Sequence, residues 1–568
     1  MPLTRVMLFV IMACSAAFFV AGCSGVGEVA QGEAQAEAPT GQPNIIFVLA
    51  DDLDYASAQQ MPEIDSLLRA GGASFENASV SYPICCPSRA TILTGLYAHN
   101  HNVKGNKRPV GGFEKFREEG HEETSIAARF QENGYRTALI GKYLNGYGQQ
   151  DETYVPPGWD EWYAKLGRYE YYDYDLNENG EVVSYGSEIG DYLTDVLSGK
   201  ATDFVRRAAV DDAPFFAYVA PTAPHSPATP AERHKGTLSD KAAPRPPSYD
   251  EEDVSDKPSW IQDLAPVTER EGSQIDDRYR ERLEATLAVD EMVGSLVDEL
   301  EAAGELDNTY VVFTSDNGYQ LGERRLKHGK KTPYEESAHV PLLVRGPGVP
   351  AGSTVENLVL NTDLASTFAE FGGLNGFESD GRSLAPLVRG EELPSWRSAI
   401  LLEAFLDGKS ASGEGKGDEG SRTDQTAFQA VRTETHKYVE HQNGEKELYD
   451  LADDPYELEN VYESAEASLI QNVKARLEAL RDCSGDGCRE AEDGASALSF
   501  GLILKSVTRP PLRGVGWGAR PHPTKSVVYS STGSVGSSDG STGGSTGYSV
   551  GPMTFSHVSS GSSSPGSM

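Results

Sequence analysis

Residues 85–95 read Cys-Cys-Pro-Ser-Arg-Ala-Thr-Ile-Leu-Thr-Gly, and this pattern predicts a short helix with a cysteine at its start. Pro87 suits the first turn, where its missing N–H costs nothing, and Gly95 can end the helix. The free N–H groups and the positive dipole end of a helix N-terminus favour a bound anion. Arg89 lies one turn after Cys85 on the same face and can bind an oxyanion. The stretch therefore predicts a nucleophilic cysteine beside an anion site, and the alternative is a buried structural cysteine.

Outside this helix, several apolar runs have the length of a strand. They cover residues 44–50, 137–140, 215–220 and 310–314. Such runs are typical of parallel strands buried on both faces. Residues 61–70 and 283–300 have helical patterns, and the second is amphipathic with a period near 3.6. This alternation predicts an α/β fold with a large, mostly parallel sheet sandwiched by helices.

Polar residues follow each of these apolar runs. They are Asp51 and Asp52, Lys142, His225, and Asp316 with Asn317. Because ligands of open α/β sheets bind beyond the carboxyl ends of the strands, we expect these side chains to converge at one edge. Carboxylate and amide oxygens suit Ca²⁺ or Mg²⁺, and calcium fits an exported protein. The alternative is that each is an ordinary surface residue, or a helix cap in the case of Asp51 and Asp52.

The string that begins at Cys85 resembles the sulfatase signature, Cys-x-Pro-Ser-Arg followed by Ala-x-x-x-Thr-Gly, with every fixed position present. The resemblance implies that Cys85 is oxidised to formylglycine (3-oxoalanine), whose hydrated aldehyde attacks sulfur and later expels sulfate. It also implies an alkaline-phosphatase-like fold and one divalent cation, usually calcium. The implied metal ligands are Asp51, Asp52, residue 85, Asp316 and Asn317.

The same resemblance assigns roles to the basic residues. Arg89, Lys142 and Lys330 would stabilise the charge on the sulfuryl oxygens, and His225 would protonate the leaving oxygen. Lys330 belongs to Gly-Lys-Lys-Thr-Pro-Tyr-Glu at residues 329–335, where Lys331 is the alternative.

One position departs from the family pattern. Many sulfatases carry a histidine two residues after the lysine that corresponds to Lys142, and this chain has Leu144 there. A second catalytic histidine is therefore in doubt, and the sequence does not place His99, His101 or His328 as a substitute.

Other segments resemble the N-acetylglucosamine-6-sulfatase branch. They are residues 141–145, 191–195, 222–227, 315–319 and 340–348, and the likeness extends over about 43–490. The resemblance implies a sulfated carbohydrate substrate, with glucosamine 6-O-sulfate as the suggested ester, and a formylglycine-generating maturation enzyme as a partner. Two alternatives remain: a phosphonate monoester or phosphodiester hydrolase of the same superfamily, or a non-catalytic glycan-binding lipoprotein.

The N-terminus has the pattern of an export signal. Arg5 precedes an apolar run at residues 6–20, and Val-Ala-Gly-Cys at 20–23 resembles a bacterial lipobox. We expect a lipoprotein held at the cell surface by lipid on Cys23, and a secreted or periplasmic protein is the alternative. The formal net charge of −37 makes nucleic acid an unfavourable partner.

Composition divides the 568-residue chain into five expected segments. They are a signal peptide (1–22), a flexible tether (23–42), a catalytic domain (43–395), a smaller α+β domain (396–500) and a low-complexity, disordered tail (501–568). Within them, residues 226–277 are expected to form a long loop, and residues 408–424 a flexible one. Cys483 and Cys488 are expected to form a disulfide, and Cys86 to pack inside.

Overall fold

The computed structural model describes residues 41–211, 213–406 and 427–494. The expected signal peptide, the loop at 408–424 and the tail at 501–568 lie outside the described residues, as does nearly all of the tether. Among the helices of the described ranges, none combines the length and the hydropathy needed to span a bilayer.

A ten-stranded mixed sheet carries the predicted strands, in the order β10-β2-β9-β8-β1-β7-β3-β4-β5-β6. The strands are β1 (Asn44–Ala50), β2 (Ala73–Ser79), β3 (Arg136–Gly141), β4 (Glu161–Lys165), β5 (Tyr174–Glu178), β6 (Glu181–Tyr185), β7 (Phe215–Ala220), β8 (Thr309–Ser315), β9 (Leu342–Arg345) and β10 (Ser353–Leu360). The central strands β8, β1, β7, β3 and β4 are parallel to one another, and antiparallel pairs lie toward the edges. This arrangement confirms the predicted fold class.

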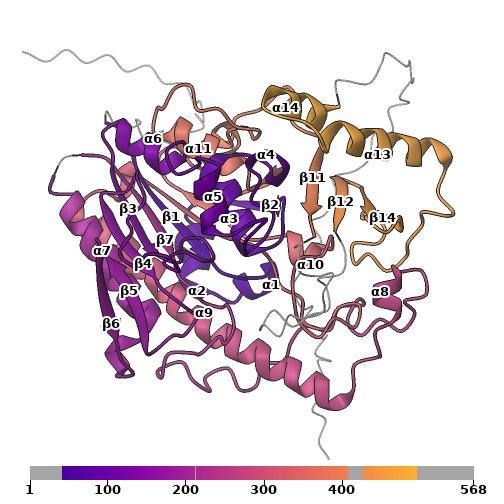
Figure 1. The fold of residues 1–568 in the computed structure, drawn as a ribbon, viewed down its shortest axis with the longest axis horizontal. Helices are drawn as coiled ribbons and strands as arrows, with labels where there is room; N and C mark the ends of the chain where they lie inside the picture. The colour runs from indigo at the N-terminus through magenta and orange to yellow at the C-terminus, as the bar shows by residue number, and fades with distance from the viewer. Residues whose placement is uncertain (1–40, 212, 407–426, 495–568) are drawn as a thin grey trace, which may run out of the picture. The chain divides into compact units, whose positions relative to one another are not determined.

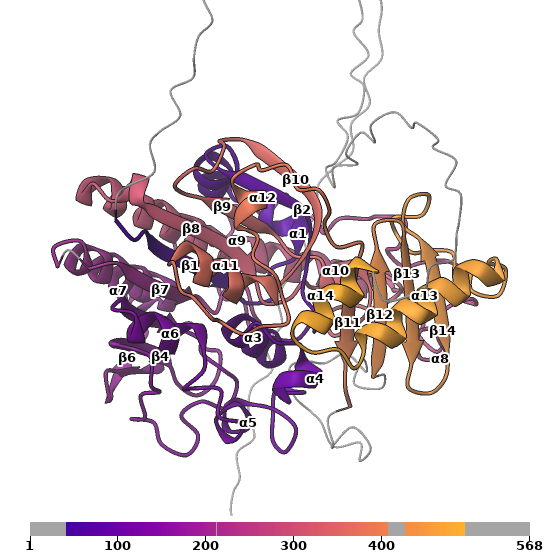
Figure 2. The same ribbon diagram turned by 90° about the horizontal axis from the view of Figure 1, so that it is seen from above.

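Helices cover both faces of this sheet, as Figures 1 and 2 show. Ile45, Phe47 and Leu49 of β1 pack with α3 (Cys85–Thr94), α6 (Ile126–Glu132) and α11 (Asp363–Phe371). The alternate residues Ile46 and Val48 pack with α7 (Leu193–Ala208) and α9 (Glu269–Ala303). Since successive side chains of a strand point to opposite faces, the unbroken apolar run of β1 supplies both cores.

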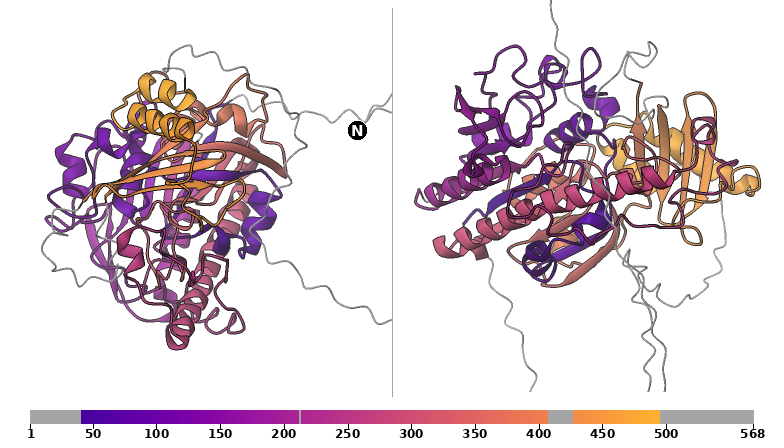
Figure 3. Two further views of the ribbon diagram at one scale, coloured as in Figure 1. Left: turned by 90° about the vertical axis from the view of Figure 1, so that its right-hand side faces the viewer. Right: turned by 90° about the horizontal axis from the view of Figure 1, so that it is seen from below.

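The prediction of a loop at 226–277 is wrong at α8 (Ser259–Gln262) and again over its last residues. Helix α9 has 35 residues and begins at Glu269, inside that range. It is the long pink helix in the right-hand view of Figure 3. Thr268 and Glu271 form a capping box that satisfies the first free N–H groups, which is why the helix begins there despite the charged sequence that follows. The predicted helix at 61–70 is present as α2 (Pro62–Ile64) followed by a π-helical turn.

Shorter helices line the connections of the described chain. They are α1 (Tyr55–Ala58), α4 (Ala98–His101), α5 (Phe113–Glu118), α8 (Ser259–Gln262), α10 (Glu335–Ala338) and α12 (Ala385–Val388).

A second, antiparallel sheet follows in the order β11-β12-β13-β14, as expected for a smaller α+β domain. Its strands are β11 (Ala399–Ala404), β12 (Phe428–Thr433), β13 (His436–His441) and β14 (Lys446–Asp450), and the helices after it are α13 (Ala467–Leu480) and α14 (Asp486–Asp493). These elements share one apolar core with Tyr82 and Tyr97 of the first part of the chain. The expected boundary at residue 395 stays a prediction.

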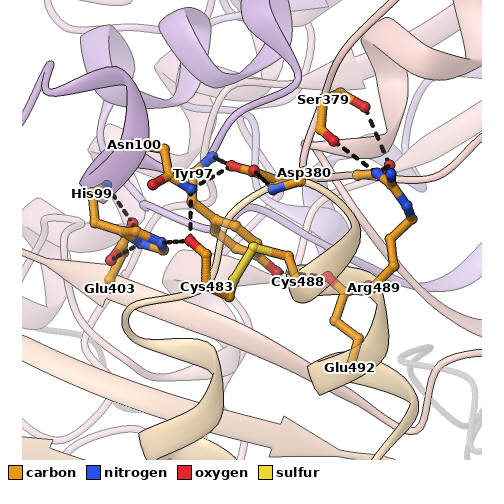
Figure 4. The surroundings of a disulfide bond; sticks show 12 residues. Tyr97, His99, Asn100, Ser379, Asp380, Glu403, Cys483, Cys488, Arg489 and Glu492 are labelled. Carbon is orange, nitrogen blue, oxygen red and sulfur yellow. Dashed lines mark hydrogen bonds and ion pairs between the residues drawn. A yellow bond between two sulfur atoms is a disulfide. The ribbon is translucent and has the colours of Figure 1, made fainter. Parts of the chain in front are cut away.

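The predicted disulfide joins Cys483 to Cys488, just after α13. His99 and Asn100 of α4 both donate hydrogen bonds to the carbonyl oxygen of Cys483, at 3.0 and 2.9 Å (Figure 4). The disulfide loop therefore ties the C-terminal helices to the segment that directly follows α3.

Candidate active site

The predicted site residues follow strands that are neighbours in the sheet. Ala50 pairs with Ser315, and Gly141 pairs with Ala220, so β1, β8, β3 and β7 end close together. Helix α3 begins at this same edge, because the thiol of Cys85 lies 3.5 Å from Oδ1 of Asp51. The expected convergence of residues far apart in the sequence is therefore present.

Cys85 lies at the first position of α3, as predicted, and Gly95 ends that helix with a left-handed backbone (φ 72°). Its side chain is fully buried, and burial raises the pKa of the thiol well above its ordinary value. Nζ of Lys330 lies 2.9 Å from its sulfur. Since the thiolate is the nucleophilic form of cysteine, the unmodified thiol is a poor nucleophile at neutral pH. Cys86 is buried in the main core, as expected.

Asp51 and Asp52 are buried carboxylates held in the charged form by cations. Burial works to raise the pKa of Asp51, but the charges of Lys142, His225 and Arg89 outweigh it, and the net shift is downward. Lys142 donates a 2.6 Å hydrogen bond to Oδ2 of Asp51. Asp52 likewise receives a hydrogen bond from Lys330, and its backbone has a left-handed conformation (φ 67°). Two charged carboxylates with cationic neighbours therefore face Cys85.

Arg89 is anchored by protein groups on one side of its guanidinium. Its Nε donates to Asp316 Oδ2 at 2.7 Å, and one terminal nitrogen donates to the carbonyl oxygen of Lys142 at 2.9 Å. The other terminal nitrogen is buried, has no hydrogen-bond partner within the described chain, and lies 3.9 Å from Asp51. That nitrogen is available to an oxyanion, and the predicted role of Arg89 stays a prediction.

His225 reaches the site from the segment after β7. Its Nδ1 donates to the carbonyl oxygen of Ser226 at 2.7 Å, and its Nε2 lies 3.9 Å from Asp52 Oδ2. Because Nδ1 is bonded to Ser226, Nε2 is the nitrogen turned toward the carboxylates. A proton carried on Nε2 can therefore be delivered inside the site.

The carboxylate and amide oxygens at this edge suit a hard divalent cation. Asp51, Asp52, Cys85 and His225 offer ligand atoms that all lie within 4.8 Å of one another. Asn317 donates through Nδ2 to Asp52 Oδ1 at 2.8 Å, and its own Oδ1 is buried without a hydrogen-bond partner in the described residues. A buried amide oxygen without a partner is costly, and a bound cation would satisfy it.

Asp316 lies among these groups, although its carboxylate already has two protein partners. Oδ2 accepts from Arg89, and Oδ1 accepts a 3.1 Å bond from the backbone N–H of Asp52. Burial and the neighbouring Asp51 raise its pKa. Asp316 therefore positions Arg89 and the backbone of Asp52, whatever else it binds.

The three histidines named as substitutes for the missing one have different positions. His99 bonds Glu403 and the carbonyl oxygen of Cys483. His101 is buried between the hydroxyl of Thr91 and the N–H of Val103. His328 lines a separate cavity of about 330 Å³ between α9 and the segment before Lys330. None of them belongs to the group around Cys85 in the described structure.

Sequence reasoning missed Arg282, a fully buried arginine of α9. It donates to the carbonyl oxygen of Asp52 and to that of Pro224, which directly precedes His225. Arg282 therefore holds the backbone of both of these site segments. A signal was present, because Arg282 lies beside apolar positions on the buried face of an amphipathic helix.

Comparison with known proteins gives the family. The family model described as Sulfatase matches residues 43–374, which is more than half of the chain. The chain belongs to the sulfatase family. A second model, described as "N-sulphoglucosamine sulphohydrolase, C-terminal", matches residues 322–483 of this sulfatase. The chain is accordingly a sulfuric ester hydrolase, as the signature at Cys85 predicted.

Relatives and solved structures agree with the family. Proteins called N-acetylglucosamine-6-sulfatase from Capra hircus and Homo sapiens are each 35% identical to this sulfatase over 497 residues. The matches cover 82% of this chain and 87% and 88% of those proteins. A solved structure in complex with its substrate, D-glucosamine-2-N,6-O-disulfate, matches with a TM-score of 0.65 and 25% identity, over 80% of this chain and all of the other.

Proposed function

We propose that this sulfatase hydrolyses sulfate esters of sulfated sugars, with glucosamine 6-O-sulfate as its preferred ester. The observation that carries the proposal is the group of Asp51, Asp52, Cys85 and His225 at one edge of the sheet. The sugar class is suggested by the names of its relatives and by the glucosamine disulfate bound to the similar structure. These two arguments are independent, since one concerns the reaction and the other the substrate.

The nucleophile is proposed to be formylglycine at position 85, made from Cys85 by a maturation enzyme. The hydrated aldehyde would supply an oxygen nucleophile together with a second hydroxyl that releases the sulfate. The buried, protonated thiol supports this proposal, because without modification the site lacks a good nucleophile. Lys330 lies beside the sulfur and would bind the oxygen that replaces it.

A single divalent cation, proposed to be calcium, would be held by Asp51, Asp52, residue 85, Asp316 and Asn317. When bound, it would supply positive charge next to the nucleophile and the sulfate oxygens. Carboxylate and amide oxygens favour calcium or magnesium over zinc.

The remaining charged side chains are proposed to act on the sulfate itself. Lys142, Lys330 and the free nitrogen of Arg89 would bind the non-bridging oxygens, since all three lie near Asp51 or Cys85. His225 would give the proton on Nε2 to the departing sugar oxygen. Its fixed Nδ1 bond supports this role, because the ring then has one defined nitrogen for the transfer.

A panel of defined esters tests the proposal. Wild-type protein expressed with a formylglycine-generating enzyme should release sulfate from glucosamine 6-O-sulfate faster than from other sugar sulfates. Cys85→Ala should abolish turnover, whereas the matched control Cys86→Ala should leave most of it. Faster hydrolysis of phosphonate or phosphodiester analogues would instead support the related hydrolase.

Mass spectrometry of the peptide that contains residue 85 tests the modification directly. Active protein should show the mass of formylglycine in place of cysteine at this position. Active protein with only the unmodified thiol would refute the assigned nucleophile. Inactive protein that binds sulfated glycans with an intact thiol would favour the glycan-binding alternative.

Export and lipid anchoring are proposed from the N-terminal sequence alone. Lipid on Cys23 would hold the enzyme at the cell surface, where polymeric substrates are accessible. Cys23→Ala should move the protein from the membrane fraction to the soluble exported fraction. An unchanged distribution would refute the lipoprotein assignment.

A further inference from the structure

We propose that Tyr169 is a positioning residue that holds the imidazole of His225 in place for proton transfer. The inference rests on the proposed function, because it takes His225 as the acid for the leaving oxygen. Tyr169 lies between β4 and β5 and is half-buried. Its ring centroid is 4.1 Å from that of His225, and the two planes are inclined by 38°.

The contact with Tyr169 restricts a motion of the imidazole that its hydrogen bonds do not restrict. The described polar contacts of the ring are Nδ1 to Ser226 at 2.7 Å and the longer approach of Nε2 to Asp52 at 3.9 Å. One hydrogen bond at Nδ1 leaves the ring able to pivot about that nitrogen. An aromatic ring against the imidazole restricts this pivot.

Tyr169 is itself fixed by groups of the same site. Asn145 donates a 2.6 Å hydrogen bond to its hydroxyl, and Nζ of Lys142 lies 4.7 Å from its ring centroid. Two residues further on, the buried hydroxyl of Tyr171 donates to the carbonyl oxygen of His225 at 2.8 Å. The segment of residues 169–171 therefore contacts both the side chain and the backbone of His225.

This arrangement also involves the part of the chain that departs from the family pattern. Leu144 occupies the place of the second histidine, and the adjacent Asn145 is the donor to Tyr169. The ring of Tyr169 thus connects the Lys142–Asn145 segment to His225 without a second histidine.

Kinetics with the sugar sulfate that wild type hydrolyses fastest test the role. Tyr169→Ala should lower kcat about tenfold to a hundredfold, with KM changed less than about threefold, because the acid is misplaced while sulfate binding is retained. Tyr169→Phe keeps the ring and should retain kcat within about threefold. Tyr172→Ala is the matched control: it removes a half-buried tyrosine of the same segment, which packs on Tyr192 instead.

A double mutant separates positioning from general support of the fold. If Tyr169 acts through His225, then adding Tyr169→Ala to His225→Ala should cost less than about twofold further in kcat. Tyr169→Leu, which keeps apolar volume, replaces Tyr169→Ala if the latter fails to fold.

Several results would overturn the inference. These are full kcat in Tyr169→Ala, an equal loss in Tyr169→Phe, a change confined to KM, or an additive loss in the His225→Ala background. Wild type that hydrolyses no sulfate ester would overturn the proposed function and this inference together, whereas active wild type with any of those results overturns the inference alone.

Discussion

Glu457→Ala should destabilise the fold strongly, because Glu457 joins β13 to the segment of residues 324–335 through buried charges. Its carboxylate is fully buried and accepts from Lys437 of β13 at 2.6 Å and from Arg324 at 3.1 Å. It also accepts a 3.0 Å bond from the backbone N–H of Glu335, which begins α10. Removing it leaves buried donors without their shared acceptor.

The expected cost follows from these three bonds. Removing one partner of a buried, hydrogen-bonded charge group costs about 3 to 5 kcal/mol. With a urea m-value of about 3 kcal/mol/M, that loss lowers the unfolding midpoint by about 1 to 1.7 M. Urea denaturation followed by circular dichroism measures the shift.

Glu463→Ala is the control, since Glu463 is an exposed glutamate of the same region. It should change the free energy of unfolding by less than about 0.5 kcal/mol. If Glu457→Ala unfolds at the same urea concentration as this control, the reasoning about the buried charges is refuted. A second readout is activity, because the segment between Arg324 and Glu335 carries Lys330.

Three further results are expected. Gly141→Ala should lower the free energy of unfolding by about 1 to 3 kcal/mol and lower kcat. Gly141 has φ +115°, and an added Cβ would lie 2.1 Å from the carbonyl oxygen of Ala220. An unchanged melting temperature would contradict this. The double variant Cys483→Ser, Cys488→Ser should lose about 2 kcal/mol of unfolding free energy, because the loop that the disulfide closes is short. A larger effect on kcat than on stability would argue against a purely structural bond. A calcium chelator should abolish turnover and lower the melting temperature. Calcium added back to a hundred times its Kd should restore about 2.7 kcal/mol of unfolding free energy. Full activity in chelator would refute the cation proposal.

The parts of the site that directly follow strands could be predicted from sequence. Asp51, Lys142 and Asp316 each come within two residues of an apolar run, and parallel pairing alone brings the ends of those runs together. The helix at Cys85 could be predicted as well, because Pro87 and Gly95 set its limits locally.

The residues that sequence reasoning missed depend on tertiary packing. Tyr169 lies in a segment without a periodic pattern, and its contacts with His225 and Asn145 exist only once β4 and β7 share a sheet. The start of α9 was missed for another reason. The residues after Glu269 are mostly charged, so the apolar period that marks a buried helix is absent there, while the cap at Thr268 was overlooked.

The order of the strands has a consequence for biosynthesis. Strand β1 is among the first parts of the described chain to be made, yet its neighbours β7 and β8 end at residues 220 and 315. Until the ribosome has delivered them, β1 has open edges that invite aggregation. During the same interval residue 85 lacks its contact with Lys330, which is synthesised later still. Because the finished fold buries Cys85, an enzyme that converts this cysteine would have to reach it before the sheet closes.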